Sequence, residues 1–216
     1  MGEVTVAPRL PAIRALTAER GGVLTSSEPE RTADPLGEPL ARALAGDEDG
    51  FGELWRLLHP ALLRYLRVRD PDTAEDIAAE TWLHVVRDLS RFSGGPAEFR
   101  AWVFTLGRHR AIDAGRARAA RPSTPTAEVI DIGTAPSAEA AALERVDTDG
   151  AVRLVATLPP AQAEMVMLRV VAGLSVAEVA AIVGKKPGTV AVNVHRALRK
   201  LARTHRDASN EGVSRR

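Results

Sequence analysis

Residues 174–201 constrain the fold more strongly than any other segment. Ser175 is followed three residues later by Glu178, a capping box that predicts the start of a helix, and Gly184 predicts its end. A longer helix is predicted over about 187–205. Apolar residues recur at three- and four-residue steps in both helices: Val176, Val179, Ala180 and Val183 in the first, then Val190, Val194, Ala197, Leu198 and Leu201 in the second. We therefore expect two helices that pack together across a tight turn.

This order of elements is that of the helix-turn-helix, whose second helix enters the major groove of DNA. The outer side of the second helix and the turn before it carry mostly cationic or hydrogen-bonding side chains: Lys185, Lys186, Thr189, Asn193, Arg196, Arg199 and Lys200. The cations there are suited to neutralise phosphates, and Thr189, Asn193 and Arg196 to reach base edges. The alternative interpretation is a helical hairpin with a solvated basic face, which spacing alone does not exclude.

The rest of the chain also shows helical spacing, interrupted by turn-forming residues at Asp70-Pro71-Asp72 and at Gly94-Gly95-Pro96. The sequence predicts an all-α protein of two small helical domains joined by a flexible acidic linker. The predicted segments are a disordered extension at 1–36, a first domain at 37–121, the linker at 122–149, a second domain at 150–206 and a disordered tail at 207–216.

Composition argues against several classes of protein. The chain has no cysteine, which removes disulfides and thiolate zinc sites and fits a reducing cytoplasm. No apolar run approaches the roughly 20 residues that span a bilayer, so we expect no membrane insertion. The five histidines show no metal-ligand spacing, and no glycine-rich phosphate loop or nucleophile–base pair stands out. We therefore expect no enzymatic activity, no metal, no cofactor and no small-molecule substrate.

The second domain resembles a known family in several short motifs. Leu158-Pro159, Gly173-Leu174-Ser175, Gly188-Thr189-Val190 and His195-Arg196-Ala197 occur in the order and at the distances found in the C-terminal domain of bacterial extracytoplasmic-function (ECF) sigma factors. The resemblance covers 151–203. It implies a domain called sigma region 4, which binds the minus-thirty-five promoter element as duplex DNA.

The first domain resembles the other half of the same family. Ala74-Glu75-Asp76-Ile77 and Glu80-Thr81-Trp82 look like the family's helix that docks on the clamp of the largest polymerase subunit, and Phe99-Arg100-Ala101-Trp102 looks like its next helix. The resemblance implies sigma region 2, with Asp76 and Glu80 docking on core RNA polymerase. It also implies promoter DNA and an anti-sigma factor as partners. The alternative interpretation is that Asp76 and Glu80 are only exposed to solvent on the surface of their helix.

Promoter opening breaks base stacking worth about 1.4 kcal/mol per step, and binding of the unpaired strand offsets that cost. The resemblance assigns this role, at the minus-ten element, to the loop before the last helix of the first domain and to the arginines of that helix. The predicted strand-binding residues are Arg91, Phe92, Arg100, Arg108, Arg110, Arg116, Arg118 and Arg121. Trp82, Trp102 and Phe99 are instead expected in the core. An alternative role for Arg116 or Arg110 is an ordinary ion pair with Asp113 on the surface of the same helix.

The chain departs from the family at a few positions. Ala79 replaces a common glutamine, His109 a common asparagine, and Ala191-Val192 a basic residue followed by serine. The expected base contacts therefore shift from 191 and 192 toward Lys185, Lys186, Asn193 and Arg196. The function predicted is a sigma factor that directs core RNA polymerase to promoters and promotes DNA melting; the alternative is a stand-alone helix-turn-helix regulator that needs only 151–203.

Overall fold

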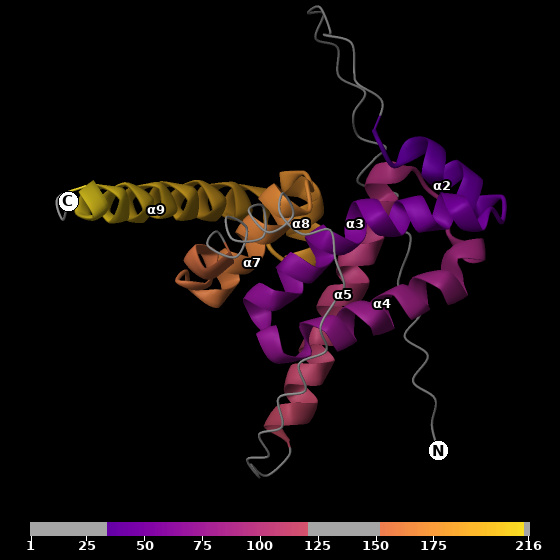
Figure 1. Ribbon diagram of the computed structural model, residues 1–216, viewed down its shortest axis with the longest axis horizontal. Helices are drawn as coiled ribbons and strands as arrows, with labels where there is room; N and C mark the ends of the chain where they lie inside the picture. The colour runs from indigo at the N-terminus through magenta and orange to yellow at the C-terminus, as the bar shows by residue number, and fades with distance from the viewer. Residues whose placement is uncertain (1–33, 121–151, 214–216) are drawn as a thin grey trace, which may run out of the picture.

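The computed structural model describes residues 34–120 and 152–213, with side chains described as far as Thr204. All regular structure in these ranges is helical. The predicted linker at 122–149, most of the predicted extension and Arg121 lie outside the described residues. Figure 1 shows one group of helices built from α2 to α5, here called the first helical group, and a second helical group from α7 to α9, whose last helix projects away from the rest.

The first helical group begins with α2 (Gly37–Leu44) and α3 (Glu48–Arg69). Leu36 is buried with this group, although the sequence predicts that the first domain starts at 37. The side chain of Asp47 caps α3 by accepting a hydrogen bond from the Asp49 amide at 2.9 Å. At Gly50 a Cβ would lie 2.7 Å from Arg42 Cβ, so the crossing of α2 and α3 requires glycine there.

Two further helices complete this group. A short 3-10 turn (Pro71–Thr73) leads into α4 (Ala74–Asp88), a second one (Leu89–Arg91) follows, and α5 covers Pro96–Ala119. Trp82, Trp102 and Phe99 are buried, as the sequence predicts. Near the crossing of α3, α4 and α5, the closest heavy atom to a Cβ built on Gly107 is Leu62 Cδ1, at 2.8 Å. The absence of a side chain at 107 thus permits this close packing.

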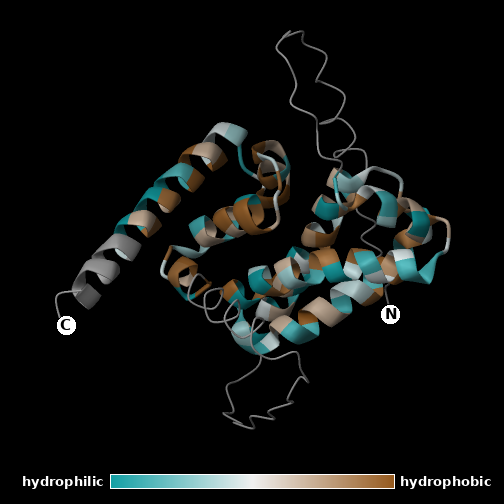
Figure 2. Cartoon of the chain, turned by 45° about the horizontal axis from the view of Figure 1, so that its top comes forward, coloured by the Kyte–Doolittle hydropathy of each residue, from teal (hydrophilic) through white to brown (hydrophobic). Residues whose placement is uncertain are grey.

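The second helical group contains a short helical segment at 152–156, α7 (Pro160–Val166), a π-helical segment (Met167–Val171), α8 (Val176–Val183) and α9 (Pro187–Val213). The segment from 160 to 171 is thus α-helical in its first part and widened to a π-helix in its second. Helix α9 continues past its predicted end near 205, into residues predicted as a tail. Apolar and hydrophilic residues alternate along its residues 187–204 (Figure 2).

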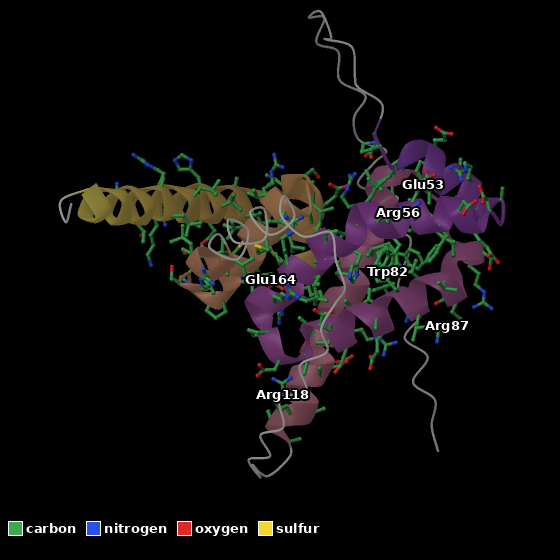
Figure 3. All side chains as sticks on the ribbon, in the orientation of Figure 1. Glu53, Arg56, Trp82, Arg87, Arg118 and Glu164 are labelled. Carbon is green, nitrogen blue, oxygen red and sulfur yellow. The ribbon has the colours of Figure 1, made fainter. Side chains whose placement is uncertain are left out.

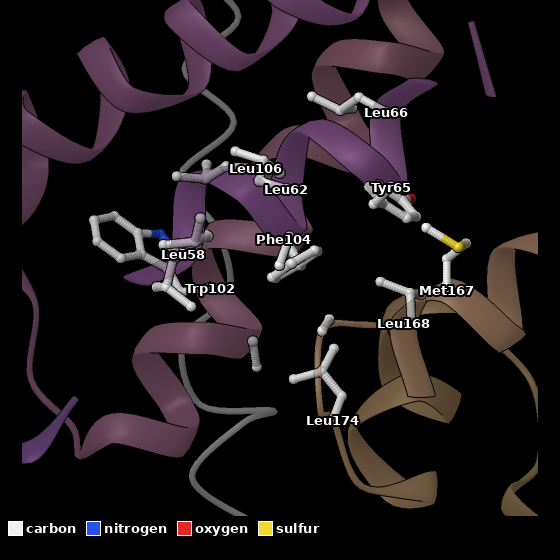
Figure 4. Packing of buried hydrophobic residues seen from close by; sticks show 14 of the residues in the cluster. Leu58, Leu62, Tyr65, Leu66, Trp102, Phe104, Leu106, Met167, Leu168 and Leu174 are labelled. Atoms are coloured by element: carbon white, nitrogen blue, oxygen red, sulfur yellow. The ribbon is translucent and has the colours of Figure 1, made fainter. Parts of the chain in front are cut away.

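The two helical groups share one hydrophobic core. Tyr65 of α3 and Phe104 of α5 are fully buried, and they belong to the same cluster of buried residues as Met167, Leu168 and Leu174 of the second group. Figure 4 shows these side chains facing one another across the junction. Four consecutive residues of α7, 163–166, are buried, because α7 packs against α9 on one side and α3 on the other.

Candidate nucleic-acid interface

Helices α8 and α9 form the predicted helix-turn-helix, and the capping residues behave as predicted. The Ser175 hydroxyl accepts a hydrogen bond from the Glu178 amide at 3.2 Å, and the Glu178 carboxylate accepts one from the Ser175 amide at 2.6 Å. Gly184 ends α8 in the left-handed conformation, at φ 67°, which favours glycine. These local devices set where the chain turns from α8 into α9.

The outer face of α9 is cationic and exposed. All but one of the predicted duplex-binding residues are exposed: Lys185, Lys186, Thr189, Arg196, Arg199 and Lys200. None of these cations pairs with a carboxylate of another described residue. Between Glu178 and Asp207 the chain has no acidic residue. This face therefore presents uncompensated positive charge, as a surface that binds phosphates does.

Asn193 is the exception among the predicted base-reading residues. Its side-chain amide donates a hydrogen bond to the Thr189 carbonyl oxygen, one turn earlier in α9, at 2.8 Å. The side chain is half-buried and turned back on its own helix. One donor of its amide is thus engaged within α9, and Thr189 and Arg196 are the exposed members of the three predicted base-reading residues.

The arginines of α5 do not form one free stripe. At about 100° of rotation per residue their spacings distribute them around the helix. Each of those described pairs with a carboxylate, at distances from 2.5 to 3.6 Å: Arg100 with Asp34, Arg108 with Glu164, Arg110 with Glu80, Arg116 with Asp113, and Arg118 with Asp70. Figure 3 places Arg118 far along α5 from the core. Strand binding by these residues stays a prediction, and it requires exchange of carboxylates for phosphates.

Two of these pairs differ strongly in exposure. Arg100 is 17% exposed, so its pair with Asp34 ties the start of the described chain to α5. Arg116 is 79% exposed and pairs only with Asp113 on the same helix. Burial acts most strongly, to raise the pKa of Asp70, but hydrogen bonds from Arg118, Thr73 and the Asp72 amide, together with the Arg118 charge, outweigh it and hold that pKa below its usual value. Arg116 is therefore the most accessible of these arginines.

The loop between α4 and α5 holds the other predicted strand-binding residues. Phe92 packs against two aromatic residues of α5: its ring centroid lies 5.2 Å from that of Trp102, nearly parallel, and 5.4 Å from that of Phe99, nearly perpendicular. Arg91 is 85% exposed and lies 4.0 Å from Asp88. Phe92 thus anchors the loop on the core, and Arg91 projects into solvent.

The predicted polymerase-docking residues lie on α4. Asp76 is exposed, and Glu80 is 59% exposed and 3.3 Å from Arg110 of α5. The same arginine lies 3.3 Å from the Nδ1 atom of His84. Burial lowers the pKa of His84, and neighbouring arginines act in the same direction. The predicted docking face and the predicted strand-binding residues are therefore electrostatically connected through Arg110.

The structure also shows a polar cluster that the sequence did not predict. Glu164 of α7 has a side chain only 10% exposed, and its Oε1 atom accepts hydrogen bonds from Tyr65, Arg69 and Arg108, at 3.1, 2.5 and 3.1 Å. Figure 3 places Glu164 where α7 meets the first helical group. Burial raises the pKa of Tyr65, and the Glu164 charge adds to that shift. No motif marks these residues, because they are widely separated in the chain.

Comparisons with known proteins agree with this architecture. Residues 54–121 match the family described as Sigma-70 region 2, and residues 150–201 match Sigma-70, region 4. The chain is 36% identical over 169 residues to the ECF RNA polymerase sigma factor BldN of Streptomyces coelicolor, a match that covers 77% of this chain and 64% of BldN. It is 33% identical over 177 residues to the factor ShbA of Streptomyces griseus, covering 77% of this chain and 93% of ShbA.

A solved structure supports the fold. The sigma factor RpoE, in complex with the anti-sigma factor NepR from Bartonella quintana, matches with a TM-score of 0.51 and 23% identity, over 70% of this chain and 93% of RpoE. The two family matches place Sigma-70 region 2 and region 4 in this one polypeptide. The chain belongs to the ECF RNA polymerase sigma factors.

Residues 34–120 and 152–213 contain no helix with both the length and the apolar character needed to cross a membrane.

Proposed function

We propose that the chain binds core RNA polymerase, directs it to specific promoters and helps to open the DNA, with the two helical groups dividing these tasks. The proposal rests above all on one observation: the chain joins a match with sigma region 2 to a helix-turn-helix whose cationic face pairs with no carboxylate among the described residues. A stand-alone regulator would need the first of these features only. The activity is non-enzymatic and belongs to the cytoplasm, where the polymerase works.

Each task is assigned to residues. The domain at 37–121 acts as region 2, docking on the polymerase clamp through Asp76 and Glu80 and holding the melted minus-ten strand. The domain at 150–206 acts as region 4, with α9 in the major groove of the minus-thirty-five element. Arg116 and Arg91 are the first contacts of the melted strand, since they are the most exposed arginines of their segments.

The arrangement of the two groups also bears on this function. Arg108 is bound to Glu164 of the other group, so it becomes available to a DNA strand only when the groups separate. Promoter elements about two turns apart lie roughly 70 Å from each other along the duplex. The packed arrangement therefore corresponds to the protein before it engages a promoter. An anti-sigma factor, like the partner in the RpoE complex, is a further partner that we expect to control this step.

Transcription with purified core polymerase tests the proposal. Wild-type protein should co-purify with core enzyme and give specific run-off transcripts from a genomic fragment library. Asp76→Lys should weaken core binding, since it reverses the charge of an exposed docking residue. Asp72→Lys, at an exposed position just before α4, is the matched control and should leave binding unchanged.

Two results would contradict the proposal. One is failure to bind core polymerase even at low salt. The other is specific duplex binding by the full chain without polymerase, unaffected by changes in the first helical group. The second result would support the stand-alone regulator.

A further inference from the structure

Val192 is exposed at the centre of the outer face of α9. Its exposed fraction is 48%, whereas Val190, Val194 and Ala197 of the same helix are buried. Because helix positions three, four and seven residues apart share a side, those three residues define the inner face. Position 192 points the opposite way. Packing within the described part of the protein therefore does not explain a valine there.

The neighbours of Val192 are polar or cationic. Thr189 and Arg196 precede and follow it by one turn on the same side, and both are exposed. Lys185 and Lys186 stand at the start of the helix, Arg199 and Lys200 lie further along, and the segment has no acidic residue. The surface thus consists of an apolar side chain surrounded by positive charge. A partner that combines negative charge with a small apolar group would complement this surface.

Duplex DNA meets both requirements. Phosphates line the major groove, and the thymine C5-methyl is the apolar group that base edges present there. Duplex RNA does not, since its major groove is too narrow for side chains and uracil lacks the methyl. Resting on the function proposed above, we propose that Val192 is a specificity-determining residue, which recognises a thymine of the upstream promoter element by contact with its methyl group.

The arrangement also says which residues share this task. The Asn193 amide donates one hydrogen bond to the Thr189 carbonyl oxygen, which leaves it less available to the base edge than Val192 and Arg196. Arg196 lies one turn beyond Val192 and has the geometry to bind a guanine or a phosphate next to the thymine. A serine at this position would place a hydroxyl where this chain has the two methyl groups of valine. The chain should therefore favour thymine where a hydroxyl would accept other bases.

A thymine-to-uracil scan isolates the methyl group. Holoenzyme reconstituted from core polymerase and the full-length chain first selects its preferred upstream element from randomised duplexes. Each thymine of the selected element is then replaced singly by uracil, and binding is measured for wild type and for Val192→Ala. Burial of one methyl group corresponds to about a fourfold change in affinity. Uracil at one position should weaken wild-type binding by about that factor, and Val192→Ala should abolish the difference.

A second exposed valine provides the matched control. Val170, in the π-helical segment, is 56% exposed, and Val170→Ala should keep the uracil penalty of the wild type. Three results would overturn the proposal. The loss of affinity with uracil could persist in Val192→Ala, uracil could have no effect at any position, or the selected element could contain no thymine. A holoenzyme that selects no upstream sequence would instead refute the proposed function. Circular dichroism of each variant confirms that α9 is intact.

Discussion

Replacing Glu164 by glutamine should loosen the packing of the two helical groups. Glutamine keeps the size of the side chain and one oxygen acceptor, but it removes the charge that faces Arg69 and Arg108. Loss of one member of a buried ion pair costs about 3–5 kcal/mol. The two arginines are 29% and 20% exposed, so solvent screens part of that loss. We expect about 2 kcal/mol, which lowers the ratio of packed to separated chains roughly 30-fold.

The measurement uses the absence of cysteine from the chain. Cysteines introduced at the exposed positions Ser93 and Thr204, one in each helical group, carry a fluorescent donor and acceptor. Glu164→Gln should lower energy transfer and increase the radius of gyration in X-ray scattering, with unchanged helix content. Glu75→Gln is the matched control, because Glu75 is 67% exposed and pairs with Arg67 on the surface. Such a pair contributes about 0–1 kcal/mol.

Unchanged energy transfer in Glu164→Gln, together with a free energy of unfolding within about 0.5 kcal/mol of wild type, would refute the role assigned to this carboxylate. A gain in transcription by the same variant would be the functional counterpart of separation, since Arg108 is then free.

Three further predictions concern single helices. Gly107→Ala should lower the free energy of unfolding in chemical denaturation, because the new Cβ would lie 2.8 Å from Cδ1 of the fully buried Leu62, and overpacking of about 1–3 kcal/mol outweighs the roughly 0.5–1 kcal/mol gained in helix propensity. Gly115→Ala on the same helix meets no neighbour and should raise that free energy by about 0.5–1 kcal/mol; equal effects of the two changes would contradict the packing argument. Ser175→Ala should lower the free energy of unfolding by about 1 kcal/mol, measured by denaturation, and weaken duplex binding, measured by DNA titration. If neither quantity falls, the cap is dispensable. Burial lowers the pKa of His59, so the neutral ring is favoured in the folded state; its stabilising effect is complete above the unfolded value of about 6.5 and is lost as pH falls through the lower folded value. The melting temperature should therefore fall on acidification from about pH 7.5 to 5.5, and less so in His59→Phe, while parallel curves would refute this.

Local patterns were sufficient for the elements that carry the predicted duplex interface. The Ser175–Glu178 capping box and Gly184 act within a few residues, so the sequence predicts α8, its end and the start of α9. Burial of Trp82 and Trp102 follows from helical spacing in the same way. The exposed cations of α9 also needed no tertiary information, since their helix has a clear apolar side.

Tertiary structure alone decided which charges are free. Arg108 is bound by a carboxylate 56 positions away, and Arg69 and Tyr65 by the same group across 95 and 99 positions. Helical spacing cannot predict such pairs, because it relates only residues that lie within a few turns of one another. The same holds for Phe92, whose ring packs on Trp102 and Phe99 of the following helix. The sequence by itself thus determined the helices and the family, and the packing of the two helical groups decided which of their side chains can meet DNA.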